Sequence, residues 1–529
     1  MCQLSGGIVR AAYLFEVRQI QRYILSTGKL RDASGASELI DGLCNDDGAA
    51  DGPSVGGIAG DLIGHLLKDP LVYRAAGGAL DLTHGSLEAV RQFRAAFRLE
   101  IARRAPGLVF SDAVESGGTD DEARAKARNA MSDGGPITGV RLPLGSPIVR
   151  PAPRSGGNPA ILQDRAPNGR CVITNEYADL ATLMARAYLE DGREGLAAKF
   201  LPGTSSGKGL KWPTVFAMDD DSRSAKSKRT VVFPFRPKMI PRIAVLHADG
   251  NGMGAIFSRA VELAQKPGAD QGSVRKLSLA LAAATRDAVR KAMEPVTAAE
   301  IDGVIPARPI VLGGDDVSLI LRADLAPGFA LDFTRAFEEL ATEAVKPFDV
   351  LEPGKRMTTK VGFVTIGANQ PFNQAYALAE SLASSARSPS ESRIAFHRIA
   401  GATIAGSASE LAEDGLGAGG YMLWRAAHSR EDFKRLIVLS ETLGHEDVGR
   451  GGLRRVAELL KSDHGRAKDV YERAVVILRD RNATVAAELS KALADLGMDG
   501  LDARPGTGGP TWCPLLQAHD LSHIFGRAA

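Results

Sequence analysis

The stretch IVLGGDDVSLIL, residues 310–321, places two adjacent carboxylates between two apolar runs. Gly313 and Gly314, which precede Asp315 and Asp316, are typical of a tight hairpin that needs positive φ, or of a backbone that approaches a ligand closely. An Asp-Asp pair taken alone is most often a solvated turn. The strand-like context and the two glycines favour instead a pair of acids that projects from a hairpin tip to bind metal.

A third carboxylate, Asp249, ends the strand-like run in RIAVLHADGNGMGAIF. A helix that we expect to begin near Ala255 follows it, and a helix N-terminus favours phosphate. The residues between leave backbone groups open to a nucleotide: Gly250, Asn251, Gly252 and Gly254. Oxygen ligands of this kind suit Mg²⁺ or Mn²⁺, and two ions about 4 Å apart are the usual arrangement for attack of a hydroxyl on an α-phosphate. The carboxylates Asp249, Asp315 and Asp316 therefore predict nucleotidyl transfer.

His247 precedes Asp249 by two positions. Strand alternation places both side chains on one face, so His247 could act as a general base. A packing role explains it equally well, and the sequence leaves both open.

An internal repeat suggests that the acids serve chemistry and not the turn. A gap of 65 positions separates Asp249 from Gly314, and 62 separate Glu16 from Gly78 in a similar run of elements nearer the N-terminus. In that first copy Ala79 and Leu80 follow the glycines. If the repeat is genuine, a Gly-Gly hairpin folds without acids; chance similarity is the alternative.

Length and composition predict a multidomain chain. Its 529 residues exceed the size at which one core usually stops growing. Apolar residues make up 44% and charged residues 24%, and the net charge of +2 is too small to argue by itself for nucleic acid or acidic lipid. We find no signal-peptide layout and no apolar run of about 18 residues, so we expect a cytoplasmic protein without a membrane partner. The four cysteines form no C-x-x-C pair, which argues against a disulfide framework or a zinc ribbon.

The order of apolar periodicities predicts four regions. Residues 1–150 alternate strand-like and helical runs, 151–240 form a connector with helices and a basic loop, 241–405 repeat the alternation, and 406–529 are mostly helical. The fold class is α+β.

The motifs ADGNGMG, LGGDD, KVGFVTIG, AYALAESLASSAR and IAFH resemble, in that order, the second palm domain of the CRISPR polymerase family, the large subunit of type III CRISPR effectors. The N-terminal LFEVRQIQRYILSTGKLRDASGASELI is similar to the first, degenerate palm of that family. The resemblance covers roughly residues 1–145 and 240–400. It implies two ferredoxin-like palm domains in tandem, a C-terminal helical domain, and condensation of ATP into cyclic oligoadenylate messengers.

The same resemblance implies roles for individual residues. Asp249, the Gly250 carbonyl, Asp315 and Asp316 would hold two ions of Mg²⁺ or Mn²⁺. Arg387 falls where relatives carry a phosphate-binding lysine, although arginine and lysine differ in reach and geometry. With Arg387, the nucleotide-binding set becomes Gly250, Asn251, Gly252, Gly254, Gly313 and Gly314.

The sequence departs from the family's pattern in two places. Many members have an N-terminal HD nuclease, whereas the first palm here begins at about Tyr13 and the His-Asp pair His519-Asp520 lies in the tail; no single-strand DNase is expected. The zinc cysteines between the palms are also missing, since Cys171 stands alone. A stand-alone or subtype-divergent member is therefore conceivable.

Two further stretches imitate binding motifs. GTSSGKG, residues 203–209, resembles a P-loop but has the wrong spacing and lacks the Ser or Thr after its lysine, so we interpret it as a loop. The basic run RSAKSKR, residues 223–229, could contact RNA or DNA phosphates, but the three aspartates at 219–221 favour a solvated loop.

The leading hypothesis is a two-metal nucleotidyltransferase that converts ATP or another nucleoside triphosphate to a cyclic nucleotide or oligonucleotide in CRISPR-type defence. The alternative is a ribonucleoprotein scaffold that binds guide or target RNA and other CRISPR-associated subunits, with an inactive, nucleotide-occupied palm. Templated polymerisation is a third reading, disfavoured because no fingers or thumb can be assigned. The retained acid pair discriminates in favour of catalysis.

Overall fold

The computed structural model of the chain describes residues 9–46, 55–76, 78–132, 137–139, 148–155, 158–161, 177–203, 209–216, 230–237, 239–266, 272–401, 405–416, 422–503 and 512–525. The chain divides into two compact units. The first comprises Met1–Phe233, Arg259–Arg286 and Asp302–Gly314; the second comprises Pro234–Ser258, Asp287–Ile301 and Asp315–Ala529. Within the described ranges, no helix has the length and apolar character needed to cross a bilayer.

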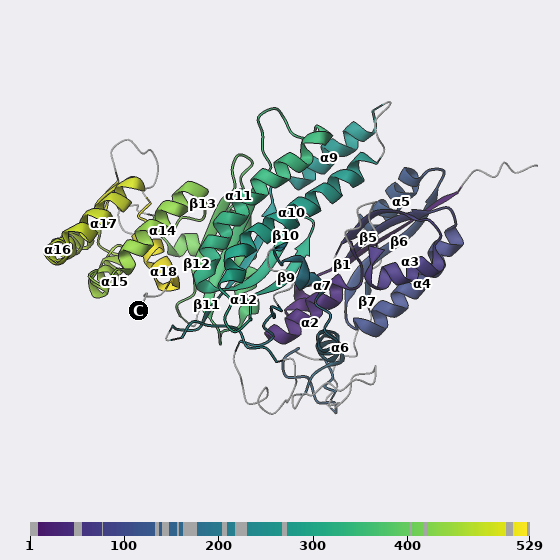
Figure 1. The fold of residues 1–529 in the computed structure, drawn as a ribbon, viewed down its shortest axis with the longest axis horizontal. Helices are drawn as coiled ribbons and strands as arrows, with labels where there is room; N and C mark the ends of the chain where they lie inside the picture. The colour runs from purple at the N-terminus through teal and green to yellow at the C-terminus, as the bar shows by residue number, and fades with distance from the viewer. Residues whose placement is uncertain are drawn as a thin grey trace, which may run out of the picture. The chain divides into compact units, whose positions relative to one another are not determined.

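The first unit is built on a five-stranded sheet in the order β4-β5-β1-β6-β7 (Figure 1). Its central strand β1 pairs antiparallel with both neighbours, β5 and β6. The strands are β1 (Arg10–Arg18), β4 (Leu71–Ala76), β5 (Ala79–His84), β6 (Val109–Gly117) and β7 (Ile137–Gly139). Aromatic side chains of β1 and α4 (Leu87–Arg104) pack edge to face at ring distances of 5.1 to 5.5 Å, as in Tyr13 with Phe93 and Phe15 with Phe97. β1 is buried on both faces over residues 11–15, and the 3.6-residue period on α4 packs against one of these faces.

The remaining elements of the first unit connect these strands or follow them. They are α1 (Ile20–Ile24), α2 (Leu30–Asp41), the short pair β2 (Asn45–Asp46) and β3 (Val55–Gly56), α3 (Gly57–Leu66), α5 (Asp120–Ser132), α6 (Leu180–Glu190), α7 (Gly195–Lys199) and β9 (Ala307–Gly313). Two helices, α9 (Met253–Ala264) and α10 (Ser273–Ala298), contribute residues to both units.

A buried ion cluster joins α2, α7 and β9 in the first unit. Arg308 on β9 is fully buried and donates to Glu38 at 3.3 Å and to Glu194 at 3.0 Å. Glu38 also accepts the backbone N–H groups of Leu196 and Ala197 in the first turn of α7. The charge of Arg308 is therefore compensated inside the core, as a buried guanidinium requires.

The second unit contains the strands β8 (Arg242–Gly250), β10 (Asp316–Arg322), β11 (Thr359–Gly367), β12 (Arg393–Arg398) and β13 (His428–Ser429). Strand β8 pairs antiparallel with β10 on one side and β11 on the other, and β11 pairs parallel with β12. The arrangement β10-β8-β11 repeats β5-β1-β6 of the first unit. The edge strands differ, because β7 is antiparallel to β6.

Helices α11 (Ala326–Val345) and α12 (Phe372–Ser385) follow β10 and β11, with the 3₁₀ turns η2 (Ala323–Leu325) and η3 (Lys346–Phe348) at the ends of α11. The C-terminal part of the second unit is mostly helical (Figure 1). It contains α13 (Ala408–Asp414), α14 (Arg430–Gly444), α15 (Arg450–Leu459), α16 (His464–Arg481), α17 (Ala483–Asp495), the short strands β14 (Met498–Asp499) and β15 (Asp502–Ala503), and α18 (Leu515–Phe525).

The predicted fold class is confirmed: two ferredoxin-like palm sheets in tandem precede a helical region. The four domain boundaries stay a prediction, since the compact units follow a different partition of the chain.

Candidate active site

The acidic end of β8 lies beside the start of β10. The antiparallel register pairs Val317 with Ala248 and Ser318 with His247. Asp249 and Asp316 are the next residues along their strands, so the register brings these two carboxylates to the same edge of the sheet. Asp249 and Asp316 are 67 positions apart in the chain. They become neighbours because β8 and β10 pair side by side, and both strands are buried along most of their length.

A two-residue link carries the other acid. Strand β9 ends at Gly313 and β10 begins at Asp316, so only Gly314 and Asp315 lie between them. Gly314 has φ +67°, a conformation that glycine adopts without strain. The sequence prediction of a tight turn at the two glycines agrees with this geometry.

Gly250 gives the Asp315 carboxylate room. A Cβ atom at Gly250 would lie 3.0 Å from Oδ2 of Asp315 and 2.2 Å from Cε of Met253. The backbone of the loop after β8 therefore approaches the acid pair closely enough that only glycine fits there undisturbed.

Asn251 fastens the loop after β8 to the segment before β11. Its backbone N–H donates to the carbonyl of Thr358 at 2.8 Å, and its Nδ2 donates to Oγ1 of Thr358 at 3.1 Å. Thr358 Oγ1 in turn donates to the carbonyl of Ser388 at 3.1 Å. Arg387, the residue before Ser388, is exposed just beyond the end of α12. These contacts join the backbone of Ser388, the residue after Arg387, to the loop that follows β8.

The helix after this loop begins at Met253, two residues earlier than expected. Gly252 has φ +70°, and Gly254 lies in the first turn of α9. The predicted backbone donors thus lie at a helix N-terminus, as the sequence indicated.

Lys360 is a site residue that sequence reasoning missed. It lies directly opposite Asp249 in the β8–β11 register, and its Nζ is 2.5 Å from Oδ2 of Asp249. The lysine is 5% exposed. Lys360 could have been found from the sequence as the charged residue that begins the apolar run KVGFVTI. A lysine buried in such a strand needs a carboxylate partner.

A buried polar network continues from the acids. His247 Nδ1 hydrogen-bonds to Oγ of Ser318 at 3.0 Å, and Ser318 Oγ hydrogen-bonds to the hydroxyl of Tyr376 at 2.9 Å. His247 Nδ1 also lies 3.4 Å from Oδ1 of Asp316. Burial lowers the pKa of His247, so at neutral pH this contact joins a neutral imidazole to the acid. Ser318 and Tyr376 are further residues that the sequence did not single out.

The acid pair holds its protons unusually tightly. Burial, a hydrogen bond with the Asp249 side chain and the charge of Asp249 raise the pKa of Asp315 to about 7. Burial and the charges of Asp249, Asp315 and Glu380 raise the pKa of Asp316 to about 8. A bound cation would reduce the repulsion between these carboxylates and favour their ionised forms.

The carboxylate and amide oxygens of the site fit a hard divalent cation. Oδ1 of Asp316 and Oδ1 of Asn251 are buried without a hydrogen-bond partner, and such oxygens are the ligands that Mg²⁺ and Mn²⁺ prefer. Among the described residues, no three His, Cys, Asp or Glu side chains already surround one point as metal ligands. Asp249 instead points an oxygen toward Lys360.

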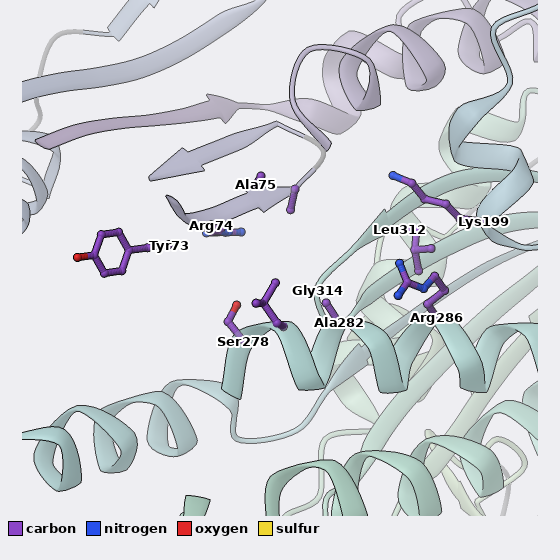
Figure 2. Close-up of a pocket in the computed structure, with 11 residues that line it drawn as sticks. Tyr73, Arg74, Ala75, Lys199, Ser278, Ala282, Arg286, Leu312 and Gly314 are labelled. Atoms are coloured by element: carbon purple, nitrogen blue, oxygen red, sulfur yellow. The ribbon is translucent and has the colours of Figure 1, made fainter. Parts of the chain in front are cut away.

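A small open hollow lies in the first unit beside strand β4 and helix α10 (Figure 2). Ser278, Ala282 and Arg286 line it from one face of α10, while Arg74 lines it from β4. Gly314, the residue before Asp315, lines it as well. The Nε atom of Arg286 is buried without a hydrogen-bond partner. The two guanidinium groups favour an anionic ligand.

Other sequence candidates lie apart from this site or outside the described residues. Asp520 pairs with Arg398 at 2.8 Å, and the ring of His519 packs against that of His523 at 4.5 Å, which is a structural arrangement. The basic run 223–229, residues 204–208 of the P-loop-like stretch and Cys171 lie outside the described residues.

Comparisons with known proteins bear on the second sheet. Residues 242–395 match the family model described as Cas10/Cmr2, second palm domain. No curated protein sequence matches the chain significantly.

Solved structures share the fold at low sequence identity. A Csm1-Csm4 cassette in complex with cA4 is 14% identical with a TM-score of 0.52, and the match covers 99% of this chain and 71% of that chain. Csm1 in T.onnurineus is 12% identical with a TM-score of 0.51, covering 98% and 70%. A Csm1-Csm4 cassette in complex with AMPPNP is 13% identical with a TM-score of 0.51, covering 98% and 70%. The likeness extends the shared fold over nearly the whole chain.

Proposed function

Since the chain belongs to the CRISPR polymerase family, whose Cas10/Cmr2 second palm domain its residues 242–395 match, we propose that it is a divalent-metal-dependent nucleotidyltransferase that converts ATP to a cyclic oligoadenylate. The observation that carries this proposal is the meeting of Asp249, Asp315 and Asp316 at one edge of the second palm sheet. The pKa values of two of these three carboxylates, Asp315 and Asp316, are raised. A bound cation would offset the negative charge that the three groups carry together.

The proposed division of labour follows from the contacts. Asp249, Asp315, Asp316 and the Gly250 carbonyl hold Mg²⁺ or Mn²⁺. The bound metal would polarise the α-phosphate and lower the pKa of the attacking hydroxyl. His247 stays neutral and orients Asp316 through the contact between Nδ1 and Oδ1.

The phosphate groups of the substrate meet the open backbone after Asp249. The N-terminus of α9 and the glycines at 250, 252 and 254 leave donors and space there. Arg387 is the proposed phosphate-binding cation, and its neighbour Ser388 accepts a hydrogen bond from Thr358, which also binds the loop after β8. The hollow beside Gly314, with Arg74 and Arg286, offers further positive charge for an anionic group.

Ligands of structurally similar proteins support the choice of nucleotide. Csm1-Csm4 cassettes with TM-scores of 0.50 or more have been solved in complex with cA4, cA3, AMPPNP and one ATP. By analogy with these ligands, we propose an adenine nucleotide as the substrate of this chain and a cyclic oligoadenylate as its product.

The test is product analysis with α-radiolabelled ATP and, in separate reactions, each other nucleoside triphosphate. Purified chain with Mn²⁺ or Mg²⁺ is compared with the Asp315→Ala/Asp316→Ala variant, with and without candidate activator RNA, by thin-layer chromatography and mass spectrometry. A cyclic product and released pyrophosphate that are lost in the variant are expected. Equal signals from wild type and variant in every condition would refute the proposal.

A second candidate is a scaffold subunit of a ribonucleoprotein. The specific observation in its favour is that similar folds were solved as Csm1-Csm4 cassettes, hence as parts of an assembly. This role predicts co-purification of guide RNA and small CRISPR-associated subunits from the native host, with no nucleotide turnover. The two candidates separate when the co-purified complex is assayed with radiolabelled ATP.

A further inference from the structure

Lys360 and Asp249 face one another across two antiparallel strands. The register pairs them directly, and Nζ lies 2.5 Å from Oδ2 of the carboxylate. Thr359, the neighbour of Lys360, donates its Oγ1 to the backbone carbonyl of Asp249 at 2.9 Å. Side chain and backbone contacts therefore both hold the start of β11 against Asp249.

Lys360 brings a buried positive charge into an acidic site. Its side chain is 6% exposed, against 33% for Asp249 and 38% for Asp316. Because an unpaired ammonium is costly to bury, Lys360 stays with a carboxylate partner as long as one is within reach.

This placement competes with one of the expected ions. Mg²⁺ binds carboxylate oxygens at about 2.0 to 2.1 Å, so an ion on Oδ2 of Asp249 would lie within a few ångströms of the ammonium, where the two cations repel each other strongly. Asp315 and Asp316 would hold the remaining ion.

We propose that Lys360 replaces one of the two divalent ions, so that the site works with one ion and one fixed ammonium. This inference rests on the proposed function and refines its metal requirement. A lysine at this position supplies positive charge beside the reacting phosphates without having to be bound from solution.

The test counts Mn²⁺ ions on the full chain without nucleotide. Calorimetric titration and electron paramagnetic resonance of free Mn²⁺ are applied to wild type, Lys360→Met and Lys360→Arg. Methionine keeps the length of the side chain and removes its charge, while arginine keeps the charge and serves as the matched control. We expect one ion per chain for wild type and Lys360→Arg, and two for Lys360→Met, with a spin-coupled manganese pair visible only in Lys360→Met.

Lys360→Ser is measured in parallel, with circular dichroism as the folding check, so that a poorly folded methionine variant does not decide the outcome. Two ions on wild type, or equal numbers on wild type and both uncharged variants, would overturn the role of Lys360. The first of these results would leave the proposed function standing, and no ion on any variant would overturn the role of Lys360 alone, because catalytic Mg²⁺ also binds through substrate phosphates. Binding by the uncharged variants alone would overturn the proposal that the wild type holds one ion beside Lys360.

Discussion

Nδ1 of His247 lies 3.4 Å from Oδ1 of Asp316 and 3.0 Å from Oγ of Ser318. A neutral, buried imidazole therefore links one member of the acid pair to the hydroxyl of a neighbouring strand. Through Ser318 the link reaches Tyr376 on α12. The orientation of Asp316 is thus set by groups on β8, β10 and α12 together.

Ser318→Ala should destabilise the chain by about 1 to 3 kcal/mol, because it removes the hydrogen-bond partner of a buried His247 nitrogen. Ser440→Ala is the matched control, since Ser440 is equally buried but bonds only to the Ile437 carbonyl of its own helix. Urea unfolding measures both variants. Equal losses would show that the His247 network contributes nothing special.

The metal-free protein should lose stability as pH rises toward about 8. The raised pKa values of Asp315, about 7, and Asp316, about 8, mean that the folded chain holds protons that the unfolded chain releases near the ordinary value of 3.8. The stabilising contribution is therefore complete below that ordinary value and is lost as pH rises through the folded-state pKa values.

Scanning calorimetry with a chelator at about pH 6 and about pH 9 checks this pH dependence. Asp315→Asn/Asp316→Asn should show a shallower fall in melting temperature than wild type. Added Mn²⁺ should stabilise wild type more at the higher pH, because carboxylates must lose their protons to bind metal. A fall of the same steepness in variant and wild type would contradict the assignment.

Gly250→Ala should weaken Mn²⁺ binding and product formation by about tenfold or more, since each 1.4 kcal/mol lost is a factor of ten. The added Cβ lies 3.0 Å from Oδ2 of Asp315 and must displace it or the Met253 side chain. Gly328→Ala in α11 is the control, because a Cβ there meets nothing within 4 Å. That variant should keep activity and gain up to about 1 kcal/mol of stability. Unchanged metal affinity in Gly250→Ala would show that Asp315 moves without cost.

Arg308→Met should destabilise the chain by about 3 to 5 kcal/mol, because it strands the buried carboxylate of Glu38. Arg335→Met removes a 3.0 Å pair with Asp332 in which the arginine side chain is 62% exposed, and should change stability by less than about 0.5 kcal/mol. Thermal or urea denaturation distinguishes the two. A small effect of Arg308→Met would indicate that Glu38 takes up a proton instead.

The sequence by itself identified the acids and the kind of element that carries each of them. Asp249 at the end of an apolar run, and Asp315 and Asp316 after a glycine pair, are local patterns, and local patterns report strand ends and turns directly. The α+β class followed from the order of such patterns, whereas the tandem palm domains were implied by the resemblance to the CRISPR polymerase family. The start of the helix after Asp249 differed by two residues, because helix ends depend on capping contacts that periodicity does not encode.

Only the tertiary structure decided which side chains surround the acids. Lys360 reaches Asp249 across 111 positions of chain, and Tyr376 reaches Ser318 across 58. Strand register and helix docking create such contacts, and both are set by the burial of whole faces instead of by neighbouring residues. For the same reason, the motifs that predicted the acidic site did not show its charge balance. The number of bound ions depends on that balance.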